Sequence, residues 1–383
     1  MNARAAVYLA FAGLGITTAT FPALIPARAA ADGEQVLLAA PMLFFGLLIG
    51  VLVTTAVGAR LRPTRIAGIG SAIQAVALIA ILVSPGAIGF IAAALIGGLG
   101  FGVSEAAGNL IARAAAQSAG TAGLLARLTG VVAVVAATVP LLFAVAAVDV
   151  WRIVLVIALA AGHAVTGALL WRSPLPVSRP ASKGARLGQR TTLLVVAVTL
   201  ALFVGVESVF AGWSAVFGER LAHLSPTAAS IATTMYWGVV AVGRFGFAVL
   251  VHRGHPPRRT FILGMILATV LLGVAATVRD TAPLVALGCI AIVVATLATG
   301  YAALVGIGLD TASDAQAPRV VGILVACGAT GGTAIPALLL ATTGDPTAMA
   351  ALLICAALTA VIAVMSGVVA SRLASVAASS HGS

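Results

Sequence analysis

Twelve long apolar runs separated by short charged connectors constrain this chain more than any other feature. About 20 apolar residues are enough to cross the hydrocarbon core of a bilayer. Between Thr192 and Phe217 the only charged residue is Glu207, so this segment is long enough to span a membrane and too apolar to lie in water. The sequence therefore predicts a multi-pass membrane protein. The runs lie at about 5–26, 35–58, 66–83, 87–112, 120–147, 150–172, 191–218, 226–250, 260–278, 282–307, 318–343 and 346–370.

The composition supports the same conclusion. Hydrophobic residues make up 61% of the 383 positions and charged residues only 8%, which leaves too little polar surface for a soluble protein of this size. The runs consist of Ala, Val, Leu, Ile and Gly without the apolar and polar alternation of a transmembrane barrel. We expect an all-α membrane protein with twelve transmembrane helices.

The formal net charge of +11 is explained by topology and does not require a nucleic-acid partner. Basic residues are retained on the cytoplasmic side of membrane proteins. If the N-terminus is cytoplasmic, only Arg28, Arg152, Arg220 and Arg279 lie in outward connectors. The remaining basic connector residues then all face inward, which predicts that both termini are cytoplasmic and that the protein lies in the cell (inner) membrane. These residues are Arg4, Arg60, Arg62, Arg65, Arg113, Arg172, Arg179, Lys183, Arg186, Arg190, Arg253, Arg258, Arg259, Arg319 and Arg372.

A basic, proline-containing connector divides the twelve runs six and six. We expect an N-terminal half at 1–172, a flexible cytoplasmic linker at 173–190 and a C-terminal half at 191–383. The segments 137–142 and 333–338 occupy the same rank in the two halves and share a central proline. The halves are therefore interpreted as two six-helix pseudo-repeats, an architecture that places a substrate site between them.

Several other classes of protein receive no support from the sequence. The segment after the first run, 26–31, loosely resembles a signal-peptide cleavage site, but its loss would leave eleven spans, so we interpret the run as the first transmembrane helix. The three cysteines all fall inside predicted spans, and no His, Cys and carboxylate cluster has the spacing of a metal site. A membrane enzyme or scaffold would need convergent catalytic groups or a large extramembrane surface. We expect neither an enzyme nor a cofactor.

Charged residues inside the spans are the first candidates for function, because an ionisable group in hydrocarbon is costly unless it has a specific role. Glu105 lies in the fourth run with Gly98, Gly102 and Asn109 at positions that share one helical face. We expect this face to be a small-residue groove in which Glu105 takes up and releases a proton and Asn109 contacts the substrate. The alternative is a structural hydrogen bond, with Arg113 or Arg127 as the partner.

The seventh and eighth runs add polar and aromatic candidates. Glu207, Ser208 and Trp213 lie within three turns of the seventh run, and Tyr236 and Trp237 lie in the eighth. Carboxylate and hydroxyl groups bond polar ligands, and an indole offers a flat apolar face with one donor. These five residues are predicted to bind substrate. The alternative for Trp213 is an aromatic belt position at the outer interface.

Arg244 is the candidate for a gate. It follows Gly243 in the second half of the eighth run, where arginine more often forms an inner ion pair or reaches lipid phosphates than binds a substrate. Asp310 and Asp314, in the connector after the tenth run, are the expected partners. His163 in the sixth run is expected to be a packed and hydrogen-bonded histidine.

Four segments in order resemble one transporter family. The segment Gly98–Asn109 resembles the glycine-rich fourth-helix motif of the fucose-galactose-glucose proton symporters of the major facilitator superfamily, and Phe203–Trp213 resembles the seventh-helix motif of that family. Tyr236–Arg244 and Gly328–Pro336 are similar to its helix 8 and helix 11. The chain departs from the family in its first run, where Pro22 occupies the position of an aspartate, and its loop at 58–63 lacks the aspartate of the superfamily's signature loop.

The resemblance implies a major facilitator fold and transport of a sugar or sugar-like metabolite coupled to protons. Glu105 matches the coupling or substrate-binding glutamate of the family and Asn109 its polar neighbour. The partners implied are a small-molecule substrate, protons and the lipid bilayer, with the protein acting as a monomer. Because the aspartate at Pro22 is missing, a proton-driven efflux pump for a drug or natural product is the alternative.

Overall fold

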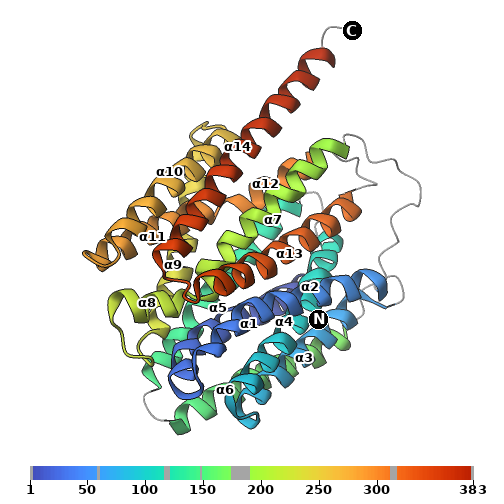
Figure 1. Cartoon of the computed structure of the whole chain (residues 1–383). Helices are drawn as coiled ribbons and strands as arrows, with labels where there is room; N and C mark the ends of the chain where they lie inside the picture. Colours follow the sequence, from blue (N-terminus) through green and yellow to red (C-terminus); the bar gives the residue numbers. More distant parts are fainter. Residues whose placement is uncertain are drawn as a thin grey trace. The chain divides into compact units, whose positions relative to one another are not determined.

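The computed structural model describes residues 3–57, 61–115, 121–146, 149–173, 190–310 and 317–380 (Figure 1). Regular structure within these ranges is helical throughout. The chain forms two compact units, which are described separately. The predicted linker at 173–190 lies outside the described residues except for its two end positions, so the division into halves at that linker stays a prediction.

The first unit holds the helices up to Trp171 together with residues 211–238. Within it, α4 packs on α1, α2 and α3, while α6 packs on α3. This unit also contains α8 and the first turns of α9. Its helices are α1 (Ala3–Asp32), the 3-10 helix η1 (Glu34–Leu38), α2 (Ala39–Val57), α3 (Pro63–Val83), α4 (Gly86–Ala115), α5 (Thr121–Val145), α6 (Asp149–Trp171), α8 (Ser214–Ala222) and, up to Gly238, α9 (Ser230–His252).

The second unit holds α7 up to Phe210 and the chain from Val239 onward. Here α10 packs on α11 and α14, and α12 packs on α13. The rings of Phe203 on α7 and Phe261 on α10 lie 5.9 Å apart, edge to face. The helices are α7 (Arg190–Gly212), α10 (Pro257–Val278), α11 (Pro283–Leu297), α12 (Gly300–Asp310), α13 (Ala317–Thr343) and α14 (Met349–Ser380).

Ten helices in the described part of the chain are long and apolar enough to cross a membrane. They correspond to the predicted runs one to seven, nine, eleven and twelve. The eighth run forms α9, and the tenth forms the shorter pair α11 and α12. The expectation of a helical membrane protein is confirmed at the level of its elements.

Two runs expected to be continuous helices are broken, so those two predictions are wrong in detail. The seventh run stops at Trp213 and restarts as α8, next to Gly212, whose missing side chain leaves room for Ala40 of α2. The tenth run breaks before Gly300, where a Cβ would collide with the rings of Phe203 and Phe261. In both cases a glycine packed closely against a partner marks the break, and such pairs depend on tertiary structure.

Proline does not end the helices that contain it. Pro140 lies inside α5 and Pro336 inside α13, the two helices of equal rank in the predicted pseudo-repeat. α1 likewise continues through Pro22 and Pro26, and its residues Phe21 and Ile25 are buried. The first run is thus a packed helix of the first unit, as expected.

Candidate functional site

Glu105 lies on α4, one turn beyond Gly102, and its side chain is partly exposed. The glycines of the same stripe do not form the open groove that was expected. A Cβ at Gly98 would overlap the carbonyl oxygen of Leu43 on α2, and a Cβ at Gly102 would overlap that of Leu47. The stripe at Gly98 and Gly102 is therefore a tight helix crossing.

Asn109 follows one turn after Glu105 and is also partly exposed. Between them Gly108 gives room to the ring of Phe11 on α1, since a Cβ there would lie 2.8 Å from that ring. Glu105 and Asn109 therefore share one face of α4 in the first unit. The side chains of Arg113 and Arg127, the alternative structural partners of Glu105, lie outside the described side chains.

Glu207 and Ser208 lie on α7 in the second unit. Glu207 is partly exposed, whereas Ser208 is 2% exposed and packs within the unit. The guanidinium of Arg244 on α9 is near enough to Glu207 to interact with it electrostatically. The structure thus brings together a carboxylate and a cation that the sequence assigned to separate roles.

Arg244 also contacts the break between α11 and α12. Its Nε donates to the carbonyl oxygen of Ala298 at 3.4 Å, and the adjacent Gly243 lies against the backbone of Ala295. Of the expected gate partners, Asp310 is the last residue of α12 with an undescribed side chain, and Asp314 lies outside the described residues. The predicted gate therefore stays a prediction.

Trp213 is fully buried in the first unit, where its indole Nε1 donates to the carbonyl oxygen of Leu37 in η1 at 3.0 Å. This bond joins residues 176 positions apart in the sequence. The only donor of the indole is therefore already engaged by the protein. In this structure Trp213 anchors the start of α8 on η1.

Tyr236 and Trp237 are neighbours on α9 and pack edge to face, with ring centroids 5.3 Å apart and an interplanar angle of 89°. Nε1 of Trp237 is buried and has no hydrogen-bond partner among the described residues. A buried donor without a partner is costly, and indole donors normally find an acceptor. Trp237 is thus the aromatic candidate whose donor is available to a ligand.

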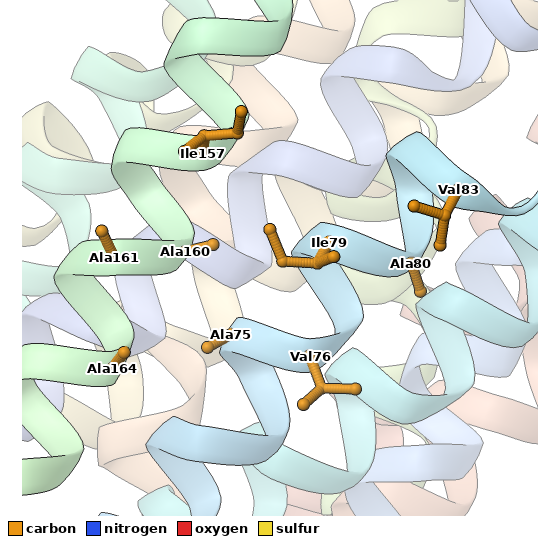
Figure 2. Close-up of a pocket in the computed structure, with 9 residues that line it drawn as sticks. All are labelled: Ala75, Val76, Ile79, Ala80, Val83, Ile157, Ala160, Ala161 and Ala164. Atoms are coloured by element: carbon orange, nitrogen blue, oxygen red, sulfur yellow. The ribbon is translucent and has the colours of Figure 1, made fainter.

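An apolar groove of about 510 Å³ lies between α3 and α6 (Figure 2). Its walls are alanines together with Val76, Ile79, Val83 and Ile157, and it contains no polar side chain. Those four larger side chains are among the exposed hydrophobic residues of the spanning helices. The groove suits hydrocarbon and offers nothing to bond a polar substrate.

The first unit contains a buried polar cluster that was not predicted from the sequence. It joins Thr17 on α1, Gln74 on α3, Ser104 on α4 and His163 on α6, each of which is 0–1% exposed. Thr17 contacts both Gln74 and His163, in agreement with the expectation of a hydrogen-bonded histidine. The available signal was Gln74, a lone amide in an otherwise apolar run, but its partners come from three other helices.

Comparison with known proteins identifies the fold. No protein-family model matches the chain, and no curated protein matches it either. Among solved structures, the chain is similar to a D-xylose-proton symporter with a TM-score of 0.76 and 14% identity, over 95% of this chain and 96% of that one. It is similar to a peptide transporter with a TM-score of 0.74 and 12% identity, over 96% and 94% of the two chains. It is also similar to the nucleoside transporter NupG, with a TM-score of 0.69 and 12% identity, over 96% of this chain and 100% of that one.

These matches extend over nearly the whole chain at sequence identities that carry information on the fold alone. The matched proteins include carriers of a sugar, a nucleoside and a peptide, as their names state. The expected fold class is confirmed, and the chain has the major facilitator fold.

Proposed function

We propose that this protein is a secondary active transporter that works by alternating access and moves a sugar or sugar-like small metabolite together with protons. The observation that carries the proposal is Glu105, a partly exposed carboxylate inside the apolar spanning segment Gly86–Ile111 of α4. An ionisable residue at such a depth is functional by default. The major facilitator fold and the likeness to a proton symporter support the assignment.

Glu105 is the proposed proton carrier. A charged carboxylate is costly in hydrocarbon and a protonated one much less so, so proton uptake favours the states in which Glu105 is shielded from water. The proton gradient is coupled to substrate movement when the carrier reorients either empty or with both proton and substrate bound, and does not reorient with only one of them. Asn109, on the same face of α4, is proposed to bind substrate next to the carboxylate.

Further substrate contacts are proposed on α7 and α9. Glu207 and Ser208 supply acceptors, and Trp237 supplies a buried indole donor without a partner among the described residues. Tyr236 packs edge to face on that indole. Carboxylate, hydroxyl and indole groups each form hydrogen bonds with hydroxyl groups. Arg244, with Asp310 and Asp314, remains the proposed inner gate, and the termini are proposed to be cytoplasmic.

A second function is favoured by one specific observation. The indole of Trp213, expected to contact a substrate ring, is fully buried and bonded to Leu37. Without that contact, fewer of the predicted side chains support a sugar as the substrate. In addition, Pro22 occupies the position at which the symporters that the chain resembles carry an aspartate. The second candidate is a proton-driven efflux pump for a drug or natural product.

Transport by purified protein in proteoliposomes tests both functions. With an imposed pH gradient, wild-type protein is expected to accumulate a sugar-like substrate, whereas Glu105→Gln is expected to lose accumulation and keep energy-independent exchange. Glu207→Gln is the matched carboxylate variant. It should weaken sugar binding more than binding of an apolar drug, because only the sugar depends on hydrogen bonds to the charged carboxylate.

If transport by Glu105→Gln depended on pH as transport by the wild type does, Glu105 would not be the proton carrier. Micromolar binding of cationic or aromatic drugs, together with no sugar binding by calorimetry, would establish the efflux function instead.

A further inference from the structure

Residues 211–238 form a segment that we call the strap, because the chain leaves the second unit to form it and then returns there. The second unit is interrupted between Phe210 and Val239, and the residues in between pack with the first unit. The strap consists of the last residues of α7, all of α8 and the first turns of α9. Both of its ends therefore continue into helices of the second unit.

The first half of the strap is bonded to η1. Nε1 of Trp213 donates to the carbonyl oxygen of Leu37 at 3.0 Å, and the guanidinium of Arg220 forms an ion pair with the carboxylate of Glu34. α8, which begins after Trp213 and contains Arg220, also packs on α1. One end of η1 is thus held by an ion pair and the other by a buried hydrogen bond.

The second half of the strap is bonded to α5 and α6. Nη2 of Arg152 on α6 donates to Oγ1 of Thr227 at 3.1 Å. Oγ1 of Thr234 donates to the carbonyl oxygen of Ala137 on α5 at 2.8 Å. The strap therefore has polar contacts with η1, α5 and α6 of the first unit.

The two helices of the strap are also bonded to each other. Oγ of Ser214 on α8 lies 2.8 Å from Oγ1 of Thr233 on α9, and both side chains are buried. Gly218 on α8 leaves room for Ala232 on α9, because a Cβ at Gly218 would collide with the side chain of that alanine. We therefore expect α8 and the start of α9 to move as one body.

The bonds from the strap to the rest of the first unit are of a kind that water can replace. A hydrogen bond within a protein is exchanged for hydrogen bonds to water when it breaks, so its net contribution is small. The side chain of Glu34 is 69% exposed, and an ion pair with an exposed partner adds little to stability. These bonds can therefore form and break, whereas the buried ring of Trp213 favours the docked arrangement.

The chain can bend where the strap leaves α7. Gly212 ends α7, and Trp213 has φ −117° and ψ 22°, outside the range of an α-helix. Residues at the ends of elements commonly act as hinges, because they absorb a change in backbone angles without the loss of a packed helix.

The strap lies at the end of the first unit that the distribution of basic residues predicts to face outward. Arg152 and Arg220, which both take part in its contacts, are among the basic residues assigned to outward connectors. The strap is thus at the opposite end of the protein from the proposed inner gate at Arg244.

We propose that the strap is an outer latch, docked on η1, α5 and α6 in this structure and released when the transporter opens to the outside. The latch rests on the proposed function, since a protein without two alternating states has no need to release it. Docking of the strap favours the state that is closed to the outside, and its contacts set how much that state is populated.

Distances between two spin labels, measured in lipid nanodiscs, test the latch without a transport assay. One label replaces Ser225 in the strap and the other replaces Gln35 in η1, both exposed, in a background without the three native cysteines. We expect a docked and a released population. Arg220→Gln and Trp213→Phe each remove one bond to η1, so each should enlarge the ratio of released to docked protein by about twofold to tenfold.

Labels at Gln35 and Val150 are the control pair, because both residues are exposed and lie in the first unit outside the strap. This pair should keep one distance in every variant. A single distance from Ser225 to Gln35 that stays unchanged when Arg220→Gln and Trp213→Phe are combined would overturn the latch.

Cross-linking tests whether release is needed for transport. Glu34→Cys with Arg220→Cys, joined by a cleavable bifunctional thiol reagent that replaces the two side chains, should lose transport and regain it after cleavage. Ser214→Cys with Thr233→Cys is the matched control, because a disulfide there joins the two helices of the strap to each other. This control should transport in both the oxidised and the reduced form.

The latch and the proposed function fail in different measurements. Wild-type transport by the cross-linked protein with Glu34→Cys and Arg220→Cys would overturn the latch, and so would an equal loss of transport in the oxidised control. If neither a sugar nor a drug were transported under a pH gradient, the proposed function would fail. The distances from Ser225 to Gln35 would then still show whether the strap leaves η1.

Discussion

At the scale of single residues, the sequence located the charged groups correctly inside the spans and could not locate their partners. Glu105 and Glu207 follow from the cost of charge in hydrocarbon, which needs no tertiary structure. The bond from Trp213 to Leu37 joins positions far apart in the chain, so an exposed aromatic and a buried one look the same in sequence. Gln74 and Thr17 escaped notice for the same reason.

Glu219 on α8 gives a pH dependence of stability with a definite sign. Partial burial raises the pKa of its carboxyl above the ordinary 4.5, with a further rise from Glu34 and an opposing effect from Arg220. The folded state therefore binds the proton more tightly than the unfolded state does, and stability falls as the pH rises from 4.5 through the raised pKa.

Glu219→Gln should accordingly raise the melting temperature at about pH 7 and have little effect at about pH 4, where the carboxyl is protonated in both states. Arg220→Gln is the matched variant of opposite sign, because Arg220 favours the charged form of Glu219 and also pairs with Glu34. An equal change in Glu219→Gln at both pH values would contradict this assignment. Thermal unfolding of the detergent-purified wild type and of the two variants measures these melting temperatures.

At the scale of helices, the glycine clusters form close helix crossings in place of the groove that was expected on α4. Gly331 on α13 lies against the backbone of Ala201 on α7 in the second unit, as Gly98 and Gly102 lie against α2 in the first. The positions of the helix breaks were not predictable, since they depend on which side chain fills the space beside a glycine. Gly300 and its two phenylalanine neighbours are an example.

The crossing of α2 and α4 predicts a large effect of a single methyl group. Gly98→Ala should destabilise the protein by on the order of 1–3 kcal/mol, because the new Cβ overlaps a backbone carbonyl that cannot move aside. Gly162→Ala on α6 is the control, since a Cβ there meets nothing within 4 Å. Removal of a helical glycine should stabilise that variant by about 0.5–1 kcal/mol. Equal melting temperatures for the two variants would mean that α2 and α4 do not cross at Gly98.

At the scale of the whole molecule, the fold was predictable because it depends on coarse properties. Run length, the small share of charged residues and the bias of basic connectors are sums over many positions, so local errors cancel. The proposed substrate contacts are a few side chains, such as Asn109, Ser208 and Trp237, whereas the same fold occurs in a sugar symporter, a nucleoside transporter and a peptide transporter among the matched structures.

Orientation in the membrane is the whole-molecule property that the distribution of basic residues predicts most directly. A cysteine at Ser182, in the linker outside the described residues, should be cytoplasmic and should escape an impermeant maleimide added to intact cells. The background needs Cys289, Cys327 and Cys355 replaced, and two of these three are buried. A cysteine at Ser225, which is exposed between α8 and α9, is the outward control and should react.

Permeabilised cells should label both positions, which separates protection by the membrane from protection by folding. Basic residues resist export because moving each charge across the bilayer is costly. An inverted protein would place on the outer side the many arginines that are predicted to face inward. Ready labelling at Ser182 with protection at Ser225 in intact cells would reverse the orientation. It would also place Arg244 and the connector after α12 on the outer side, and the proposed inner gate would become an outer one.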